Sequence, residues 1–229
     1  MPVDLRALLE GRALPGGRPL ESRGALPVAV VTMELQRGVI GDLAGFPELA
    51  AAARSADVVS RTARLLDAAR RSGVAVVHCT AEFRADRAGT IVNTPLHAAV
   101  LRRPDHLLRG TAATELVPEL GPAPQDIVCS RTHGVSPFAG TSLDATLRGL
   151  GARTLVVAGV SVNLGILGLC IEAVNYGYQV ALPIDAVAGV PHSYAERVVR
   201  TTLALIATLT TVEDVVHVLS RERPSTSTS

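Results

Sequence analysis

The residues best suited to chemistry are charged side chains that follow short apolar runs. Glu34 comes directly after the run Pro27–Met33, and Arg131 comes directly after the run Ile127–Ser130. A charged group beside a buried segment is costly unless it is paired or hydrogen-bonded. Glu34 is therefore the strongest acid–base candidate, and we expect an ion pair between Glu34 and Arg131. The residues leave open whether this pair does chemistry or only ties two strand ends together.

Other polar and aromatic residues are candidates for binding a small molecule near that pair. His133 lies shortly after the arginine and can hydrogen-bond a substrate, although a loop histidine of this kind also fits a solvated surface. Phe83 and Phe138 are candidate walls for a cyclic ligand. Asp185 follows the apolar run Gln179–Pro183, and we expect it to cap the next turn rather than take part in chemistry.

Short apolar runs alternate with longer amphipathic segments, and this alternation positions the candidate residues. Five runs are continuously apolar, as strands buried on both faces are: Pro27–Met33, Val74–Cys79, Ile127–Ser130, Thr154–Gly159 and Gln179–Pro183. Strands alternating with helices predict right-handed crossovers and a parallel sheet. Ligands bind beyond the carboxyl ends of such strands, so the pattern places Glu34 and Arg131 at one edge.

The segments between these runs carry apolar residues at helical spacing. They are Glu48–Ser72, Ser142–Leu150, Leu164–Tyr176 and Ser193–Leu209. Gly73, Gly151 and Gly177 stand where three helices end, as C-terminal caps do. A short strand near Thr210–Val212 and a helix over Glu213–Ser220 complete the pattern. We therefore expect an α/β fold, a three-layer α-β-α arrangement around a doubly wound, mainly parallel sheet of six strands.

Length and composition fit one globular domain. The 229 residues carry 22 basic and 21 acidic side chains, and the net charge of +1 gives no reason to expect a nucleic-acid or membrane partner. The N-terminal segment lacks the apolar core of a signal peptide, and the run Thr154–Val162 is too short to cross a membrane. We expect a soluble, cytoplasmic protein with an N-terminal arm (1–25), one domain (26–220) and a flexible tail (221–229), both ends loosely ordered.

Two segments suggest roles beyond the sheet. The stretch Ala81–Pro124 is poor in strands and rich in arginine and histidine. An insertion of this length is usually a lid or a subunit contact, although a solvated surface loop fits the residues equally. The helical segment Tyr194–Leu209 is too apolar to leave one flank in water, which predicts a homodimer or homotetramer.

Thiol chemistry is not favoured by the cysteine pattern. Cys79, Cys129 and Cys170 are too scattered for a disulfide framework or a zinc site. We expect Cys79 near the rim of the binding edge, Cys129 deeper in the sheet and Cys170 on a helix face pointing elsewhere. Each fits an inert buried thiol better than a nucleophile. All basic residues are arginine, and the chain contains no lysine.

The string VVTMELQRGVIGD, which contains Glu34, resembles the first-strand signature of the isochorismatase-like hydrolases. The similarity continues through Gly110–Thr111, Glu115–Leu116, DIVCSRTHGVSPFAGTSLDATLRGLG, TLVVAGVSVNLGI and YGYQVALPIDAVAG. It spans roughly Val28–Gly189 and implies the fold of that superfamily, which includes nicotinamidases, carbamoylsarcosine amidases and isochorismatases.

Amidases of this superfamily use Asp, Lys and a nucleophilic Cys, which fall on Glu34, Arg131 and Gly165 here. Arg131 keeps the charge but cannot release its proton near neutral pH, and Gly165 removes the thiolate of the covalent mechanism. Isochorismatases similarly lack the Cys and hydrolyse a vinyl ether by proton delivery and attack by water. This resemblance implies Glu34 as the proton donor. Arg131 then either pairs with Glu34 or binds a substrate carboxylate.

The resemblance implies further features of the site. A non-proline cis peptide is expected at Val160–Ser161, with the N–H groups of Ser161 and Gly165 forming an anion hole. Gln36 resembles the family's Gln after the first strand and is expected to brace the site and contact substrate. The metal motif of nicotinamidases is replaced by His78-Cys79-Thr80, so we expect no metal and no cofactor.

Three hypotheses about function stay open at this point. The first is a hydrolase of isochorismatase type, without covalent thiol catalysis, acting on a small, anionic, enol-ether-like or cyclic metabolite. The second is a degenerate member that binds a metabolite or a partner without turnover. The third is an amidase that uses a non-standard Cys.

Overall fold

The computed structural model describes residues 4–10 and 27–221 of the 229-residue chain. Most of the expected N-terminal arm and tail lie outside these residues, but Leu5–Leu9 forms the short helix α1. The Asp4 carboxylate caps α1 by accepting from the backbone N–H of Arg6 at 2.9 Å. Leu8 and Leu9 are buried in the core. The expectation of a loosely ordered end is therefore wrong for α1, because two adjacent leucines bury against the domain.

A single parallel sheet organises the described residues, with its strands in the order β3-β2-β1-β4-β5-β7 and β6 paired to β4. The strands are β1 Val28–Met33, β2 Ala75–Ala81, β3 Ile127–Arg131, β4 Thr154–Val160, β5 Gln179–Pro183, β6 Val187–Ala188 and β7 Thr208–Thr210. The doubly wound α/β prediction is confirmed. The sheet has seven strands rather than the expected six, because β6 is only two residues long and too short to leave a periodic signal.

The remaining helices, with one exception, lie where amphipathic segments were expected, with different breaks. They are α2 Pro47–Ser55, α3 Val58–Arg71, α4 Pro95–Leu101, α5 Leu143–Gly149, α6 Leu167–Asn175, α7 His192–Arg197 and α8 Val212–Arg221. The exception is α4, which was not expected and lies within the 81–124 segment. The expected helix over 48–72 is two helices, because Asp57 adopts a left-handed conformation with φ 54°. The α-helix expected over 193–209 is shorter than expected. It is followed by a π-helical turn at Val198–Thr202 and a 3₁₀ turn at Leu203–Leu205. None of the described helices is both long and apolar enough to span a membrane.

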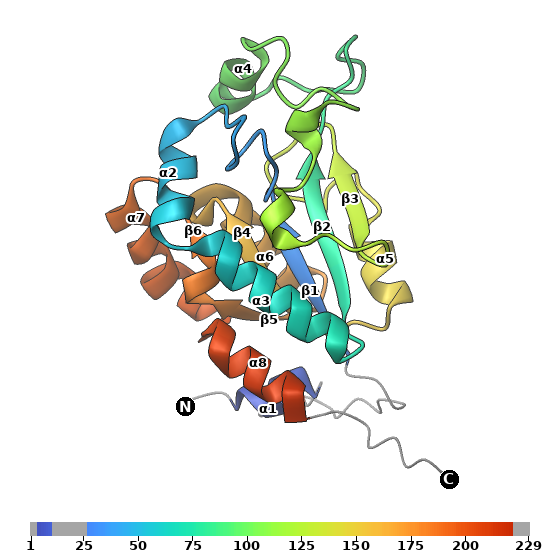
Figure 1. The fold of residues 1–229 in the computed structure, drawn as a ribbon, viewed down its shortest axis with the longest axis vertical. Helices are drawn as coiled ribbons and strands as arrows, with labels where there is room; N and C mark the ends of the chain where they lie inside the picture. Colours follow the sequence, from blue (N-terminus) through green and yellow to red (C-terminus); the bar gives the residue numbers. More distant parts are fainter. Residues whose placement is uncertain (1–3, 11–26, 222–229) are drawn as a thin grey trace.

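Helices cover both faces of the sheet and create two apolar layers. Alternate β1 residues divide between them, with Val28 and Val30 in one layer and Ala29 and Val31 in the other. Helices α3 and α8 pack together on the first face, and α3 crosses the front of the sheet in Figure 1. All strand pairings are parallel. Consequently, the carboxyl ends of the strands meet at the upper edge of the sheet.

The strand order reverses direction beside β1. From β1 the chain builds outward through β2 and β3, and it then returns to the other side of β1 with β4. Such a switch point opens a crevice at the carboxyl ends of the two strands, where α/β sheets bind ligands. The part of the 81–124 segment that contains α4 lies above this edge in Figure 1.

Candidate functional site

Glu34 and Arg131 meet at the carboxyl ends of β1 and β3. Arg131 Nη2 donates to Glu34 Oε1, and Arg131 Nε donates to the carbonyl of Gly134 at 3.1 Å. The side chains are 8% exposed for Arg131 and 18% exposed for Glu34. Glu34 has a left-handed backbone with φ 52°, and its N–H donates to the carbonyl of Cys79 at 2.8 Å. The expected ion pair is confirmed.

One nitrogen of the Arg131 guanidinium is not used in these contacts. Nη1 is buried and has no hydrogen-bond partner among the described residues. A buried donor without a partner is unfavourable. Nη1 is therefore the nitrogen of the guanidinium that still lacks an acceptor among the described residues.

The pair lies in a cavity of about 350 Å³. Most of the wall is apolar, and Leu49, Phe83, Val100 and Leu107 are among its residues. Polar side chains also line it: Glu34, Glu48, His97, His106, Arg131, His133, Ser161 and Asn163. A small ligand with an apolar body and a few polar groups fits such a lining.

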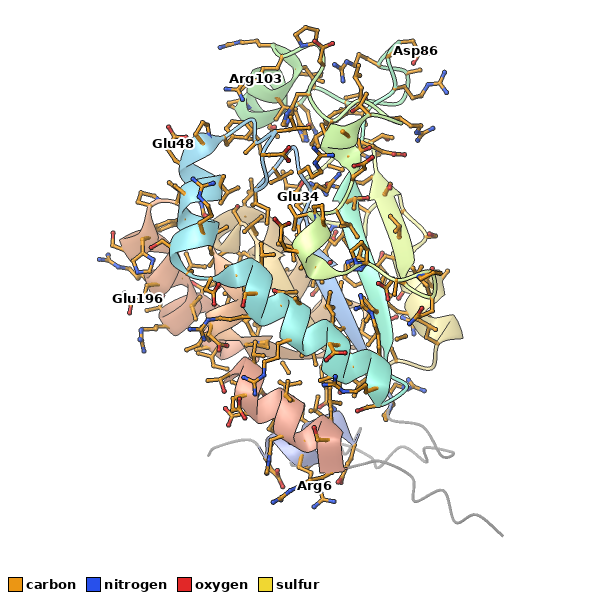
Figure 2. All side chains as sticks on the ribbon, in the orientation of Figure 1. Arg6, Glu34, Glu48, Asp86, Arg103 and Glu196 are labelled. Atoms are coloured by element: carbon orange, nitrogen blue, oxygen red, sulfur yellow. The ribbon has the colours of Figure 1, made fainter. Side chains whose placement is uncertain are left out.

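The 81–124 segment forms one wall of the cavity. It contributes Phe83, Leu96, His97, Val100, His106 and Leu107. Figure 2 places Glu34 at the upper end of the sheet, beneath the part of this segment that carries Arg103. This placement supports a functional interpretation of the segment over a purely solvated loop.

His97 fixes this wall to the loop after β3. Its Nδ1 lies 2.8 Å from Thr94 Oγ1, and its Nε2 lies 3.2 Å from the carbonyl of Gly134. That carbonyl also accepts from Arg131. The imidazole therefore connects α4 to the same loop that holds the guanidinium.

His106 occupies a pocket left open by a glycine distant in the chain. A Cβ at Gly45 would lie 2.4 Å from His106 Cε1 and 2.7 Å from Nδ1. Phe46 contacts the imidazole edge-on, with ring centroids 6.1 Å apart, and Arg103 lies over the Phe46 ring. Burial lowers the pKa of His106, and the nearby Arg103 charge adds to this effect. The imidazole is therefore neutral near pH 7.

His106 and Asn163 are site residues that sequence reasoning missed. Asn163 Oδ1 is buried and has no partner among the described residues. The sequence contained one usable signal, the histidines of the 81–124 segment. The packing contact between His106 and Gly45 could not be inferred, because the two residues are 61 positions apart in the chain.

The turn after β4 has the implied cis peptide between Val160 and Ser161. A π-helical turn, Val162–Ile166, follows and leads into α6. Ser161 and Gly165 both line the cavity. A Cβ at Gly165 would lie 3.0 Å from Met33 Cε and 3.2 Å from the carbonyl oxygen of Val160, so a side chain there requires a small shift of both groups. An anion hole formed by these N–H groups stays a prediction.

None of the three cysteines, all within the described residues, lines the cavity. The expectation that Cys79 lies at the rim is wrong, because β2 continues to Ala81 and Cys79 is buried within it. Burial raises the pKa of the Cys79 thiol well above its ordinary value. Burial also raises the pKa of Cys170 to about 12. These two thiols are poor nucleophiles near neutral pH.

Two expected ligand contacts are placed elsewhere. Phe138 is buried in the core, where it stacks on Tyr176 with centroids 5.2 Å apart, so it is not a wall of the cavity. Gln36 is fully buried and does not line the cavity. Its Nε2 donates to the carbonyl of Ala81 at 2.9 Å, and its Oε1 accepts from the Ala81 N–H at 2.8 Å. Gln36 braces the strand ends, as the bracing part of the expectation proposed.

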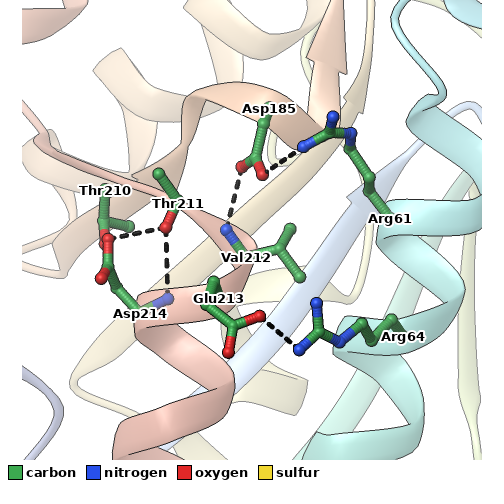
Figure 3. Close-up of polar contacts among 8 residues, drawn as sticks. All are labelled: Arg61, Arg64, Asp185, Thr210, Thr211, Val212, Glu213 and Asp214. Atoms are coloured by element: carbon green, nitrogen blue, oxygen red, sulfur yellow. Dashed lines mark hydrogen bonds and ion pairs between the residues drawn. The ribbon is translucent and has the colours of Figure 1, made fainter.

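Asp185 has a structural role between α3 and α8. One carboxylate oxygen accepts from the N–H of Val212 at 2.9 Å, at the start of α8, and the other pairs with Arg61 at 2.7 Å (Figure 3). The expected capping role is correct, but the capped element is α8 rather than the adjacent turn. The reason is a long-range contact that the local sequence does not encode.

His78 is held by contacts inside the sheet. It is fully buried, with Nδ1 at 2.7 Å from Thr32 Oγ1 and Nε2 at 3.3 Å from Asp126. Within residues 4–10 and 27–221, no cluster of three or more His, Cys, Asp or Glu side chains is arranged to hold a metal ion.

The chain is similar in sequence to known proteins of one family. An isochorismatase domain model matches residues 28–214. The chain is 29% identical over 199 residues to the uncharacterized isochorismatase family protein YecD of Escherichia coli O157:H7, covering 85% of this chain and 97% of that protein. It is 29% identical over 215 residues to ureidoacrylate amidohydrolase RutB of Agrobacterium fabrum, covering 86% and 92%.

A solved structure has the same architecture. The isochorismatase family protein from Desulfovibrio vulgaris superimposes with a TM-score of 0.72 at 28% identity, covering 85% of this chain and 99% of that chain. The family model spans β1 to the start of α8 and therefore includes every strand of the sheet. The chain belongs to the isochorismatase family of hydrolases.

Proposed function

We propose that this protein hydrolyses the enol ether of a small metabolite without a covalent thiol intermediate. The metabolite has an apolar or cyclic body and carries a negative charge. The observation that carries the proposal is the pairing of Glu34 with Arg131 at a cavity whose turn presents Gly165 in place of a thiol. Glu34 is the acid next to the cation, and no cysteine shares the cavity.

The reaction needs one proton donor and one water. Protonated Glu34 delivers its proton to the enol carbon, and positive charge develops on the carbon that bears the ether oxygen. Water adds to that carbon and returns a proton to the Glu34 carboxylate. The resulting hemiketal separates into a ketone and an alcohol, so one water is consumed and Glu34 ends as it began. Arg131 keeps its proton throughout, because a guanidinium does not release it in proteins.

Two other functions compete with this proposal. The relative RutB is named as a ureidoacrylate amidohydrolase, but the buried cysteines, two of them with raised pKa values, do not favour thiol-based amide hydrolysis here. A binding protein without turnover is favoured by one specific observation, the closed contact between Glu34 and Arg131 in the free structure. An ion-paired carboxylate must gain a proton before it acts as an acid.

A substrate panel tests the proposal. Purified protein is incubated with isochorismate, ureidoacrylate and nicotinamide, and products are separated by liquid chromatography. We expect hydrolysis of isochorismate and none of the two amides. Prior alkylation with iodoacetamide should leave the rate unchanged, because no thiol lines the cavity.

Three results would contradict the proposal. Loss of isochorismate hydrolysis after alkylation would assign the activity to a cysteine such as Cys79 or Cys129. Hydrolysis of an amide at a rate above that of isochorismate would replace enol-ether chemistry with amidase chemistry. Failure of all three compounds, with a measurable affinity for isochorismate, would favour the binding protein.

A further inference from the structure

The hydrogen-bond pattern of Arg131 is incomplete in a specific way. Nη2 donates to Glu34, and Nε donates to the Gly134 carbonyl. Nη1 is buried without a partner among the described residues. The side chain is 8% exposed and belongs to the cavity wall. An acceptor carried by a ligand would complete this guanidinium.

A carboxylate suits this donor better than a neutral acceptor. Guanidinium and carboxylate groups are planar and form charge-assisted hydrogen bonds that are stronger than neutral ones. The surrounding wall, with Phe83, Leu96 and Val100, is apolar and suits the body of such a ligand. The cavity thus combines a cation at one place with apolar surface elsewhere.

A bound carboxylate would change the charge balance of the site. Arg131 carries one positive charge, and Glu34 already neutralises it. A second carboxylate leaves one negative charge in excess in a cavity with a mostly apolar wall. Two carboxylates that share such a site bind a proton between them, because both cannot be ionised at low cost.

We propose that Arg131 Nη1 forms a subsite for the carboxylate of an apolar ligand, and that the ligand enters together with one proton taken up by Glu34. The inference deepens the proposed function and rests on it for the use of that proton. It explains how the ion-paired Glu34 of the free protein becomes the acid that enol-ether hydrolysis requires.

Other titratable groups around the cavity are weaker candidates for this proton. His97 is engaged by Thr94 and Gly134, His133 lies near Thr132, and Cys79 is a buried thiol in β2. Glu48, an exposed acid of α2, lies at the mouth.

His106 is the strongest competitor, because it is buried in the same cavity and feels the Glu34 charge. The cations Arg103 and Arg87 oppose its protonation, and burial lowers its pKa. We therefore assign the proton to Glu34.

Titration calorimetry with benzoate tests the inference, and benzamide serves as the uncharged control of the same shape. Measurements at pH 7 in buffers of different ionisation enthalpy count the protons exchanged. We expect benzoate to bind at least tenfold tighter than benzamide, with uptake approaching one proton. Its affinity should fall as the pH rises, because one proton is bound together with the ligand, whereas benzamide should show no proton uptake.

Three variants assign the groups. Glu34→Gln should bind benzoate at least as tightly as the wild type, without proton uptake and with little dependence on pH. Arg131→Lys keeps one charge for Glu34 but lacks the second terminal nitrogen, so benzoate affinity should fall at least tenfold and benzamide affinity should change less than twofold. His106→Gln should keep the proton uptake.

The inference is overturned if benzoate binds no better than benzamide, if it binds without proton uptake, or if uptake persists in Glu34→Gln and disappears in His106→Gln. These outcomes differ from failure of the proposed function. A protein that binds benzoate with a proton but hydrolyses no enol ether retains the subsite and loses the hydrolase assignment. A protein that hydrolyses isochorismate without proton-linked benzoate binding retains the hydrolase and loses the subsite.

Discussion

Replacing Glu34 by Gln separates a catalytic carboxylate from a structural ion pair. Gln has nearly the same volume and keeps an oxygen that can accept from Arg131 Nη2, but it cannot transfer a proton. Proton transfer by a positioned side chain typically contributes about 10²- to 10⁴-fold in rate. We therefore expect kcat for isochorismate to fall by at least about 100-fold.

The expected loss of stability follows from the burial of the two side chains. Removing one partner of a fully buried pair costs about 3–5 kcal/mol, because the other charge is left bare. Here Glu34 is 18% exposed at a cavity wall, and Gln keeps a hydrogen bond from the Arg131 guanidinium but removes its counter-charge. The expected loss therefore lies between that of a fully buried pair and that of an exposed pair, at about 1–2 kcal/mol. For a chain of this length that corresponds to a fall in Tm of roughly 2–8 °C.

The chain offers a closely matched control in Glu82. Its side chain is 19% exposed and pairs with Arg109, so exposure and partner type resemble those of Glu34. Glu82 does not line the cavity, and Arg109 is half-exposed. Glu82→Gln should therefore cost about 1 kcal/mol or less and leave turnover within about twofold.

Thermal and urea denaturation give the stabilities, and initial rates on isochorismate give the activities. A Glu34→Gln protein with unchanged turnover would refute the role of Glu34 as proton donor. A loss above about 3 kcal/mol would instead identify the contact with Arg131 as a buried structural pair.

Three further predictions concern packing, pH and assembly. Gly45→Ala should lose about 1–3 kcal/mol by overpacking against His106, whereas Gly149→Ala, with open space around its Cβ, should be neutral or stabilising in thermal denaturation. Burial lowers the pKa of His78 and His106 from 6.5. The stability measured in urea titrations should therefore be fully present above pH 6.5 and fall below it, by up to about 1 kcal/mol per pH unit for His78 and by less for His106. A flat stability profile from pH 7 to 5 would contradict this. The exposed Leu205 and its apolar neighbours lead us to expect a homodimer or larger assembly, which a light-scattering mass near 23.8 kDa would exclude.

Sequence alone determined the succession of strands and helices along the chain and the place of the acid–base pair. β5 has the predicted bounds, Gln179–Pro183, and Glu34 and Arg131 follow β1 and end β3 as expected. Continuous apolar runs are a local signal, and parallel strands necessarily bring their carboxyl ends to one edge. The pairing could therefore be predicted without coordinates.

Tertiary structure decided which residues surround that pair. Two phenylalanines were equal candidates, but only Phe83 lines the cavity, whereas Phe138 packs in the core. The outcome depends on how the 81–124 segment folds back over the sheet, and no local periodicity encodes that path. The packing of His106 against Gly45 also depends on how this segment folds back. Contacts between segments distant in the chain arise from packing of the whole domain, so they require the folded structure.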